Sequence, residues 1–522
     1  MTPTTERSVS NSNLKGWVPV IGDTHGRRPL FDVLTATAHH LQDELIAGRL
    51  RSAQIIEEYY RAICAHNGYL NAVYALAPGA MKRAQEMDEK ISNGEFLGPL
   101  HGIPVLVKDN ILTSRNLGMS TTAGSLALDG ADSIWNARVI DLEMANRKGV
   151  GLHDGWSSIA GQCVSAYVRG GLDPTDGTRG HSSCAGSSAG SAVAVSAGMA
   201  PIALGTETNV SLSTPALRAA LYSLKPTLGL VSRDGIIPIS HRFDTAGPLA
   251  KDTRDVADLL SVMVDFRSVP KGGYASAVGD VNSWKDINVG TLDPRTWRYP
   301  DSMVKLVIEA TVETARTIIH AVIWILTALS QTTKTQEAYD LIKSLADSYH
   351  SDVALRSVND FDIDGENSIS EALITDFESD LNRYLGTNQN CRVSTLKELV
   401  EWNFAHAEKA LPPDLLVKSL AVGDDAQRRS MLLAHMKNVG ESLEDTFNKY
   451  GIDLIIGPGD CSLRCPLATV PLNCLEYNGR PIGLVVIARP YQESLLLKFM
   501  GAFEASFPGR KTPTAFQHAY KI

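Results

Sequence analysis

Residues 185–191 read Ala-Gly-Ser-Ser-Ala-Gly-Ser, so three serines stand between residues that carry little or no side chain. Such a segment lets the backbone approach a bound molecule closely and leaves the serine hydroxyls unshielded. The Ala-rich apolar residues 191–201 follow directly and are expected to form a buried helix. This apolar run argues against a flexible Gly/Ser linker, and we interpret residues 185–191 as part of a functional site.

The same residues also match the pattern G-x-S-x-G around Ser188, which is typical of the nucleophile elbow of α/β-hydrolases. An elbow requires a strand immediately before the serine. Residues 178–183 are instead polar and loop-like (Thr-Arg-Gly-His-Ser-Ser). The surrounding sequence therefore disfavours an elbow, and we keep it only as an alternative.

Residues 98–109, upstream of the serines, read Gly-Pro-Leu-His-Gly-Ile-Pro-Val-Leu-Val-Lys-Asp. The glycines and prolines predict a turn, and the apolar run after them predicts a buried strand that ends at Lys108. Successive side chains on a strand point to opposite faces, so Asp109 need not lie beside the Lys108 amine. A lone lysine at a strand end is usually exposed on the surface. Only the surrounding sequence favours a buried, functional Lys108 instead.

Further strands are predicted far along the chain, at residues 452–456 (Ile-Asp-Leu-Ile-Ile) and 483–487 (Gly-Leu-Val-Val-Ile). Helices are predicted where apolar residues recur with helical spacing, at residues 30–65, 80–91, 253–264 and 495–507. Strands at both ends with helices between them predict an α/β fold whose central mixed sheet is assembled from distant segments.

At 522 residues the chain exceeds the usual size of one hydrophobic core. We expect a flexible tail at residues 1–27, followed by one domain at residues 28–522. Within that domain, residues 28–95 are interpreted as a helical preface and residues 270–450 as an α-rich insertion. The longest apolar run, residues 318–329, is shorter than the roughly 20 residues of a membrane span and is expected to be a buried helix.

The formal net charge of −9 argues against a nucleic-acid or anionic membrane partner, because such partners select for clustered Lys and Arg. The seven cysteines are scattered, and the close pair Cys461 and Cys465 lacks neighbouring zinc ligands, so we expect reduced thiols and no metal. The polar N-terminus has no apolar signal-peptide core, which predicts a cytoplasmic protein. A homodimer is compatible with the sequence.

Four segments together resemble the amidase-signature family in their order and spacing. They are residues 98–109, residues 185–191, the Gly-Thr-Glu-Thr of residues 205–208 leading to Ser211, and the Leu-Lys-Pro-Thr of residues 224–227. The segment Tyr-Asn-Gly-Arg-Pro-Ile-Gly-Leu at 477–484 resembles the fungal-type branch of that family. The similarity spans most of residues 30–515. It implies the amidase-signature fold, with a central mixed β-sheet flanked by helices, and no organic cofactor.

The resemblance also implies which residues carry the chemistry. The family's nucleophilic serine falls on Ser211, its bridging serine, held by a cis peptide bond, on Ser187, and its lysine on Lys108. In this Ser-cisSer-Lys triad the nucleophile forms an acyl-enzyme while the other two residues move its proton. The lysine acts only when neutral, and shifting a pKa from about 10.4 to about 7 corresponds to roughly 4–5 kcal/mol, a shift that burial favours. The implied activity is hydrolysis of a non-peptide C–N bond in a small-molecule amide.

The tetrahedral intermediate needs an oxyanion hole, which the family builds from backbone N–H groups before and at the nucleophile. Here these groups belong to Thr208, Asn209, Val210 and Ser211, with Ser188 expected beside them in substrate binding. Relatives generally have small residues, mostly glycine, before the serine. A β-branched residue resists positive φ, so Val210 is expected to distort the oxyanion hole and impair activity if the turn needs glycine-like geometry.

Two other departures concern Ser213, where many relatives have arginine, and residues 137–146, where a helix and a strand of the family are shortened. Two further functions therefore stay open. One is a catalytically degenerate amidase-like protein that binds a ligand without turnover. The other is a glutaminase-type subunit of an amidotransferase, which would have a stable partner chain.

Overall fold

The computed structural model describes residues 28–131, 133, 136–137, 153–174, 176, 180–279, 283–292, 331–355, 362–363, 366–388, 390–410, 414–423, 425–459 and 465–516. The tail expected at residues 1–27, the apolar run 318–329 and all but the first residue of the shortened segment 137–146 lie outside the described residues.

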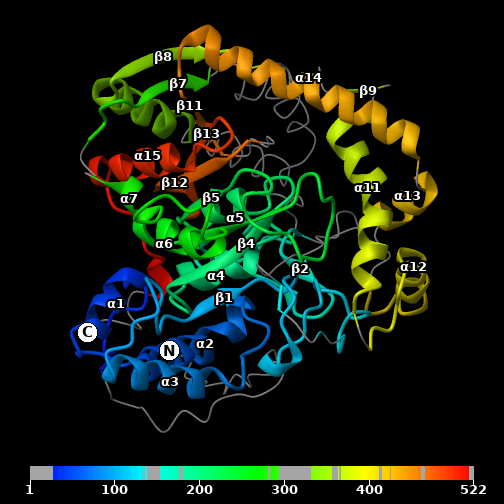
Figure 1. Ribbon diagram of the computed structural model, residues 1–522, viewed down its shortest axis with the longest axis horizontal. Coiled ribbons are helices and arrows are strands. Elements are labelled where there is room, and N and C mark those ends of the chain that lie inside the picture. The colour runs from blue at the N-terminus through cyan, green and yellow to red at the C-terminus, as the bar shows by residue number, and fades with distance from the viewer. Residues whose placement is uncertain are drawn as a thin grey trace, which may run out of the picture.

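A nine-stranded mixed sheet forms the centre of the fold (Figure 1). In spatial order its strands are β1 (Val105–Val107), β4 (Ile202–Glu207), β6 (Thr245–Ala250), β5 (Tyr222–Lys225), β12 (Leu467–Cys474), β13 (Pro481–Ala488), β11 (Leu454–Pro458), β7 (Asn288–Leu292) and β8 (Ser348–Val353). Neighbours run parallel at β1–β4, β11–β7 and β7–β8 and antiparallel at the other pairings. The predicted mixed sheet from distant segments is therefore confirmed.

Helices cover both faces of the sheet, which explains why the central strands β4, β6, β5 and β13 are buried at every position. On one face, α4 (Ala189–Ser196) and α5 (Ser213–Arg218) share a buried cluster with Ala203 of β4. On the other, α6 (Thr253–Met263) and α15 (Glu493–Ser506) share a cluster with Ile202 and Leu204 of the same strand. Successive strand residues point to opposite faces, so the two helix pairs lie on opposite sides.

The predicted N-terminal helices are present as α1 (Ala38–Ile46), α2 (Ser52–Leu70) and α3 (Ala80–Ser92), and they lie at the β1 end of the sheet (Figure 1). Shorter elements of this part of the molecule are η1 (Arg115–Leu117), the hairpin of β2 (Trp156–Ser157) and β3 (Gly161–Gln162), and η3 (Thr514–Phe516). The short helix α7 (Ala275–Val278) packs against α15 and α6 instead.

The interval 270–450 contains α11 (Ser368–Leu385), α12 (Leu396–Ala405), α13 (Asp414–Val422) and α14 (Ala426–Tyr450), which form an arm beside the sheet (Figure 1). It also contains the small hairpin of β9 (Asp362–Ile363) and β10 (Glu366–Asn367). The helical interpretation missed β7 and β8, which extend the central sheet. β8 reads Ser-Tyr-His-Ser-Asp-Val and lies at the sheet edge, where a strand is polar and carries little apolar pattern.

Among the described residues, no helix combines the length and the apolar character needed to cross a bilayer.

Candidate active site

Two parallel strands end side by side where the predicted site residues lie. Val107 of β1 pairs with Leu204 of β4, so the chain leaves both strands at the same edge of the sheet. The residue after β1 is Lys108, and the turn after β4 consists of residues 208–211. β1 is half-buried at all three positions, not fully buried as predicted, and its pairing with the buried β4 sets the distance between these segments.

Lys108 is buried, with 6% of its surface exposed. Its Nζ donates hydrogen bonds to Ser187 Oγ at 2.8 Å and to Thr206 Oγ1 at 2.9 Å. The strand register explains the second bond, because Thr206 lies two residues beyond the β4 partner of Val107. The Lys108 amine is consequently within direct proton-transfer distance of Ser187.

Ser187 and Ser188 connect the serine segment to the end of β4. The Gly186–Ser187 peptide bond is cis. The backbone N–H of Ser188 donates to the Ser211 carbonyl at 2.9 Å, and the Ser188 hydroxyl bonds both the N–H and the carbonyl of Thr206 at 3.1 Å. Because the Ser188 hydroxyl is buried and already has these partners, its expected part in substrate binding stays a prediction.

Two buried carboxylates hold the turn 208–211 at its ends. Asp244 Oδ1 accepts a hydrogen bond from the Thr208 hydroxyl at 2.5 Å. Glu207 Oε2 accepts from the backbone N–H and the hydroxyl of Ser213, at 2.9 and 2.8 Å. The N–H groups between these anchors are fixed in position, as donors of an oxyanion hole must be.

Val210 adopts a left-handed backbone conformation, with φ of 58°. This conformation costs an L-residue roughly 1–2 kcal/mol, and a β-branched side chain makes it less favourable. Val210 is nonetheless buried, with 4% of its surface exposed. The turn therefore takes the glycine-like geometry that a valine resists, and the fold around it holds this strained residue in place.

The hydroxyl of Ser211 has no hydrogen-bond partner within the described part of the chain, although its carbonyl accepts from Ser188. Ser211 and Asn209 are half-buried, whereas Thr208 is buried. The structure thus brings Lys108 and Ser187 into contact and places the main chain of Ser211 beside them. The chemical roles expected of these residues stay proposals.

Asp109 follows Lys108 but points elsewhere. Its carboxylate accepts hydrogen bonds from the hydroxyl and the N–H of Thr122 and from the N–H of Gly124. Burial raises the pKa of the Asp109 carboxyl to about 6, against these bonds, which lower it. As the alternation of strand side chains indicated, its partners are the loop residues Thr122 and Gly124.

Asp244 allows the electrostatics of the turn to be tested. Burial raises the pKa of its carboxyl from 3.8 to about 7, although bonds from Thr208, Ile239 and Ser240 lower it. Between about pH 4 and pH 7 the folded chain therefore binds more protons at this site than the unfolded chain, and stability falls as the pH rises. An asparagine has the same shape and does not titrate. In the wild type, titration of Asp244 should lower the free energy of unfolding by about 2–3 kcal/mol between pH 5 and pH 8, and we expect this part of the decrease to be absent in Asp244→Asn.

Urea denaturation of both proteins at the two pH values measures this difference. Asp43→Asn, on an exposed position of α1, is the matched control and should leave the pH dependence as it is in the wild type. If Asp244→Asn also leaves it unchanged, the Asp244 carboxyl does not titrate in this range.

Within the described residues, one cluster has the composition of a metal site: His39, Asp252 and Asp255. His39 Nδ1 lies 3.2 Å from an Asp252 oxygen and 3.0 Å from an Asp255 oxygen. Hydrogen bonds to Asp252 and Asp255 raise the pKa of His39 to about 10, so the imidazole is protonated at neutral pH. A protonated imidazole has no lone pair for a metal, and the cluster is better described as an ion pair that joins α1 to α6.

Thr206, Glu207 and Asp244 contact the site, and the sequence interpretation gave none of them a role, although Thr206 and Glu207 lie in the quoted segment 205–208. Thr206 could have been found from the parallel register of β1 and β4, which puts it beside Lys108. Asp244 is brought to the turn only by the antiparallel pairing of β6 with β4. The sequence around Thr208 does not indicate this pairing.

Comparisons with known proteins agree with the architecture. A family model described as Amidase matches residues 54–458. A Schizosaccharomyces pombe protein whose name assigns it provisionally to the amidases is 27% identical over 93% of this chain and 88% of its own length. One component of the glutamyl-tRNA(Gln) amidotransferase of Staphylococcus aureus is 26% identical over 88% of this chain and 94% of its own. The crystal structure of a peptide amidase from Stenotrophomonas maltophilia superimposes with a TM-score of 0.73 at 28% identity, covering 92% of this chain and 98% of that one.

Proposed function

Because the chain belongs to the amidase family, we propose that it hydrolyses a carboxamide bond of a small molecule through an acyl-enzyme on Ser211. The observation that carries this proposal is the 2.8 Å hydrogen bond between the buried Lys108 amine and Ser187. A serine hydroxyl is a poor nucleophile until a base takes its proton. A buried amine next to a second hydroxyl is a suitable base, and Ser188 ties that hydroxyl's segment to the Ser211 main chain.

The reaction proceeds in two halves. Ser211 Oγ bonds to the carbonyl carbon while its proton passes to Ser187 Oγ, and Ser187 gives its own proton to neutral Lys108. The relay then runs in reverse, the departing nitrogen is protonated, and the C–N bond breaks to leave an ester on Ser211. Water adds to this ester with the same relay as its base, and the carboxylic acid leaves as Ser211 regains its proton.

The oxyanion of each tetrahedral intermediate is stabilised by backbone N–H groups of the turn 208–211. One such donor is worth on the order of 3 kcal/mol in the transition state. Asp244 and Glu207 anchor the two ends of the turn, so the donors need no reorganisation during the reaction.

A fluorophosphonate probe tests the proposed nucleophile directly, because it reacts only with an activated serine. We expect one covalent adduct per chain, mapped to Ser211 by mass spectrometry of the digested protein. The proposal fails if the adduct maps to another serine, or if amides are hydrolysed while Ser211 stays unmodified by the probe.

A ligand-binding protein without turnover is a second candidate, and the left-handed conformation of Val210 favours it. The branched side chain of Val210 crowds a close approach to the turn, which would weaken the binding of an oxyanion there. This candidate predicts ligand binding with neither hydrolysis nor probe labelling.

A glutaminase-type subunit of an amidotransferase is a third candidate, motivated by the similarity to the Staphylococcus aureus amidotransferase component. It predicts a stable partner chain. Size-exclusion chromatography with light scattering, on protein purified from its own cells, separates a complex from an isolated chain.

A further inference from the structure

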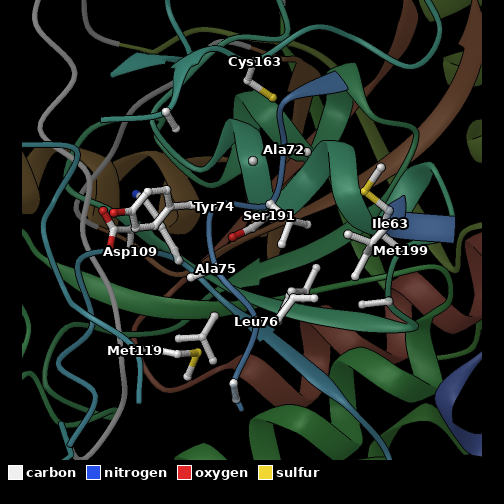
Figure 2. Close-up of a pocket in the computed structure, with 18 of the residues that line it drawn as sticks. Ile63, Ala72, Tyr74, Ala75, Leu76, Asp109, Met119, Cys163, Ser191 and Met199 are labelled. Atoms are coloured by element: carbon white, nitrogen blue, oxygen red, sulfur yellow. The ribbon is translucent and has the colours of Figure 1, made fainter. Parts of the chain in front are cut away.

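A cavity of about 250 Å³ lies beside β1, and Figure 2 shows some of the residues that line it. β1 is the end strand of the described sheet, paired with β4, and all three of its residues line the cavity. Further wall residues come from α2, from residues 71–77, from the β2–β3 hairpin, and from segments that follow β1 and flank or begin α4. Most wall side chains are apolar or aromatic, among them Ile56, Tyr60, Ile63, Leu76, Met119 and Met199.

The cavity connects the protein surface with the buried lysine–serine pair. Lys108 and Ser187 both line it, and both are buried. Ala75, Met119 and Ile159 also line it and are half-exposed, so this part of the wall is next to solvent. The wall of the cavity therefore includes residues next to solvent as well as the buried Lys108 and Ser187.

The lining residues indicate which side of an amide the cavity would hold. Of the described residues, Lys108 and Ser187 belong to the wall, whereas the turn 208–211 does not. In amide hydrolysis the carbonyl oxygen lies against the oxyanion donors, and the proton relay serves the departing nitrogen. Building on the function proposed above, we propose that this cavity holds an apolar substituent on the amide nitrogen. The chain then cleaves N-substituted amides and releases an apolar amine.

Size and charge define the substituent further. An apolar cavity of roughly 150 Å³ holds benzene, and this one, at about 250 Å³, has room for a benzyl-sized group. The Asp109 carboxylate in its wall already accepts hydrogen bonds from Thr122 and Gly124. An unpaired charge buried among these side chains would be strongly unfavourable. The substituent is therefore an uncharged arylalkyl or branched alkyl group.

Two isomeric amides test the assignment: N-benzylacetamide carries its ring on the nitrogen, and 3-phenylpropanamide carries it on the acyl side. Each is compared with its ring-free counterpart, N-methylacetamide for the first and propanamide for the second. We expect the ring to raise kcat/KM at least about tenfold in the first pair and less in the second. Ala75→Leu narrows the cavity and should lower the ratio of kcat/KM for N-benzylacetamide to kcat/KM for N-methylacetamide about tenfold. Met119→Trp narrows the same cavity from its half-exposed rim and should act in the same way.

Ala65→Leu is the matched control, because Ala65 is exposed on α2 and does not line the cavity. A ring effect confined to 3-phenylpropanamide, or activity on N-benzylacetamide that neither cavity variant changes, would overturn the assignment. If no amide is hydrolysed, the proposed function fails. Titration calorimetry with N-benzylacetamide still tests whether the cavity binds this group. N-benzylacetamide should then bind the wild type at least about tenfold more tightly than Ala75→Leu, and equal binding to both would refute the site.

Discussion

Replacing Ser211 with alanine is expected to lower kcat/KM for the best amide of a panel by at least about 10⁴-fold, because removing the nucleophile of a serine relay leaves only binding and oxyanion stabilisation. Ser211 has no hydrogen-bond partner for its hydroxyl within the described residues, so the loss of its oxygen should change the stability of the fold by less than about 1 kcal/mol. The measurement is steady-state hydrolysis together with the urea midpoint of each protein.

Ser92→Ala supplies the matched control, since Ser92 is an exposed serine at the end of α3, and this variant should retain wild-type kinetics. Residual hydrolysis in Ser211→Ala above about 1% of wild type, with an unchanged urea midpoint, would mean that another residue attacks the amide. The non-hydrolysing candidate makes the opposite forecast, namely that wild type and Ser211→Ala are equally inactive.

The strands that were predicted correctly from the sequence are buried strands with an uninterrupted apolar composition. β13 reads Pro-Ile-Gly-Leu-Val-Val-Ile-Ala and is buried at every position, which produces an uninterrupted apolar run. β6 is equally buried but contains Gly247 and Pro248, residues that are depleted in strands. A Cβ at Gly247 would lie 2.3 Å from the carbonyl oxygen of Leu224, so this glycine is required by the neighbouring strand. Such a requirement cannot be detected along the chain.

The site shows the same division between local and long-range information. Lys108, Ser187 and the turn 208–211 were predicted because each lies in a short segment with unusual composition and in the order of a known family. Asp244 acts on the turn only through the tertiary fold, at 2.5 Å from Thr208. The cavity beside β1 likewise depends on which strands the sheet contains at that edge, and no single segment of the sequence predicts it.

Lys108→Arg is expected to reduce kcat/KM by about 10²–10⁴-fold, the usual contribution of a general base. An arginine carries a permanent positive charge and can still donate to Ser187 and Thr206, but it does not lose its proton at neutral pH. If the lysine served only as a buried charge that orients the hydroxyls, arginine would preserve most of the activity. The substitution thus separates a proton acceptor from a fixed cation.

Lys108→Met removes the amine at similar length and should lose activity to the same extent, so it covers the case in which the larger arginine disturbs the buried site. Lys285→Arg, at an exposed position, is the control for the charge-preserving change and should behave as wild type. The rate of fluorophosphonate labelling at Ser211 should fall in parallel with hydrolysis in both Lys108 variants, because the same relay activates the serine for either electrophile. Unchanged labelling in Lys108→Met, in a protein with an unchanged urea midpoint, would show that Ser211 is activated by a group other than Lys108, and the 2.8 Å contact with Ser187 would then be structural.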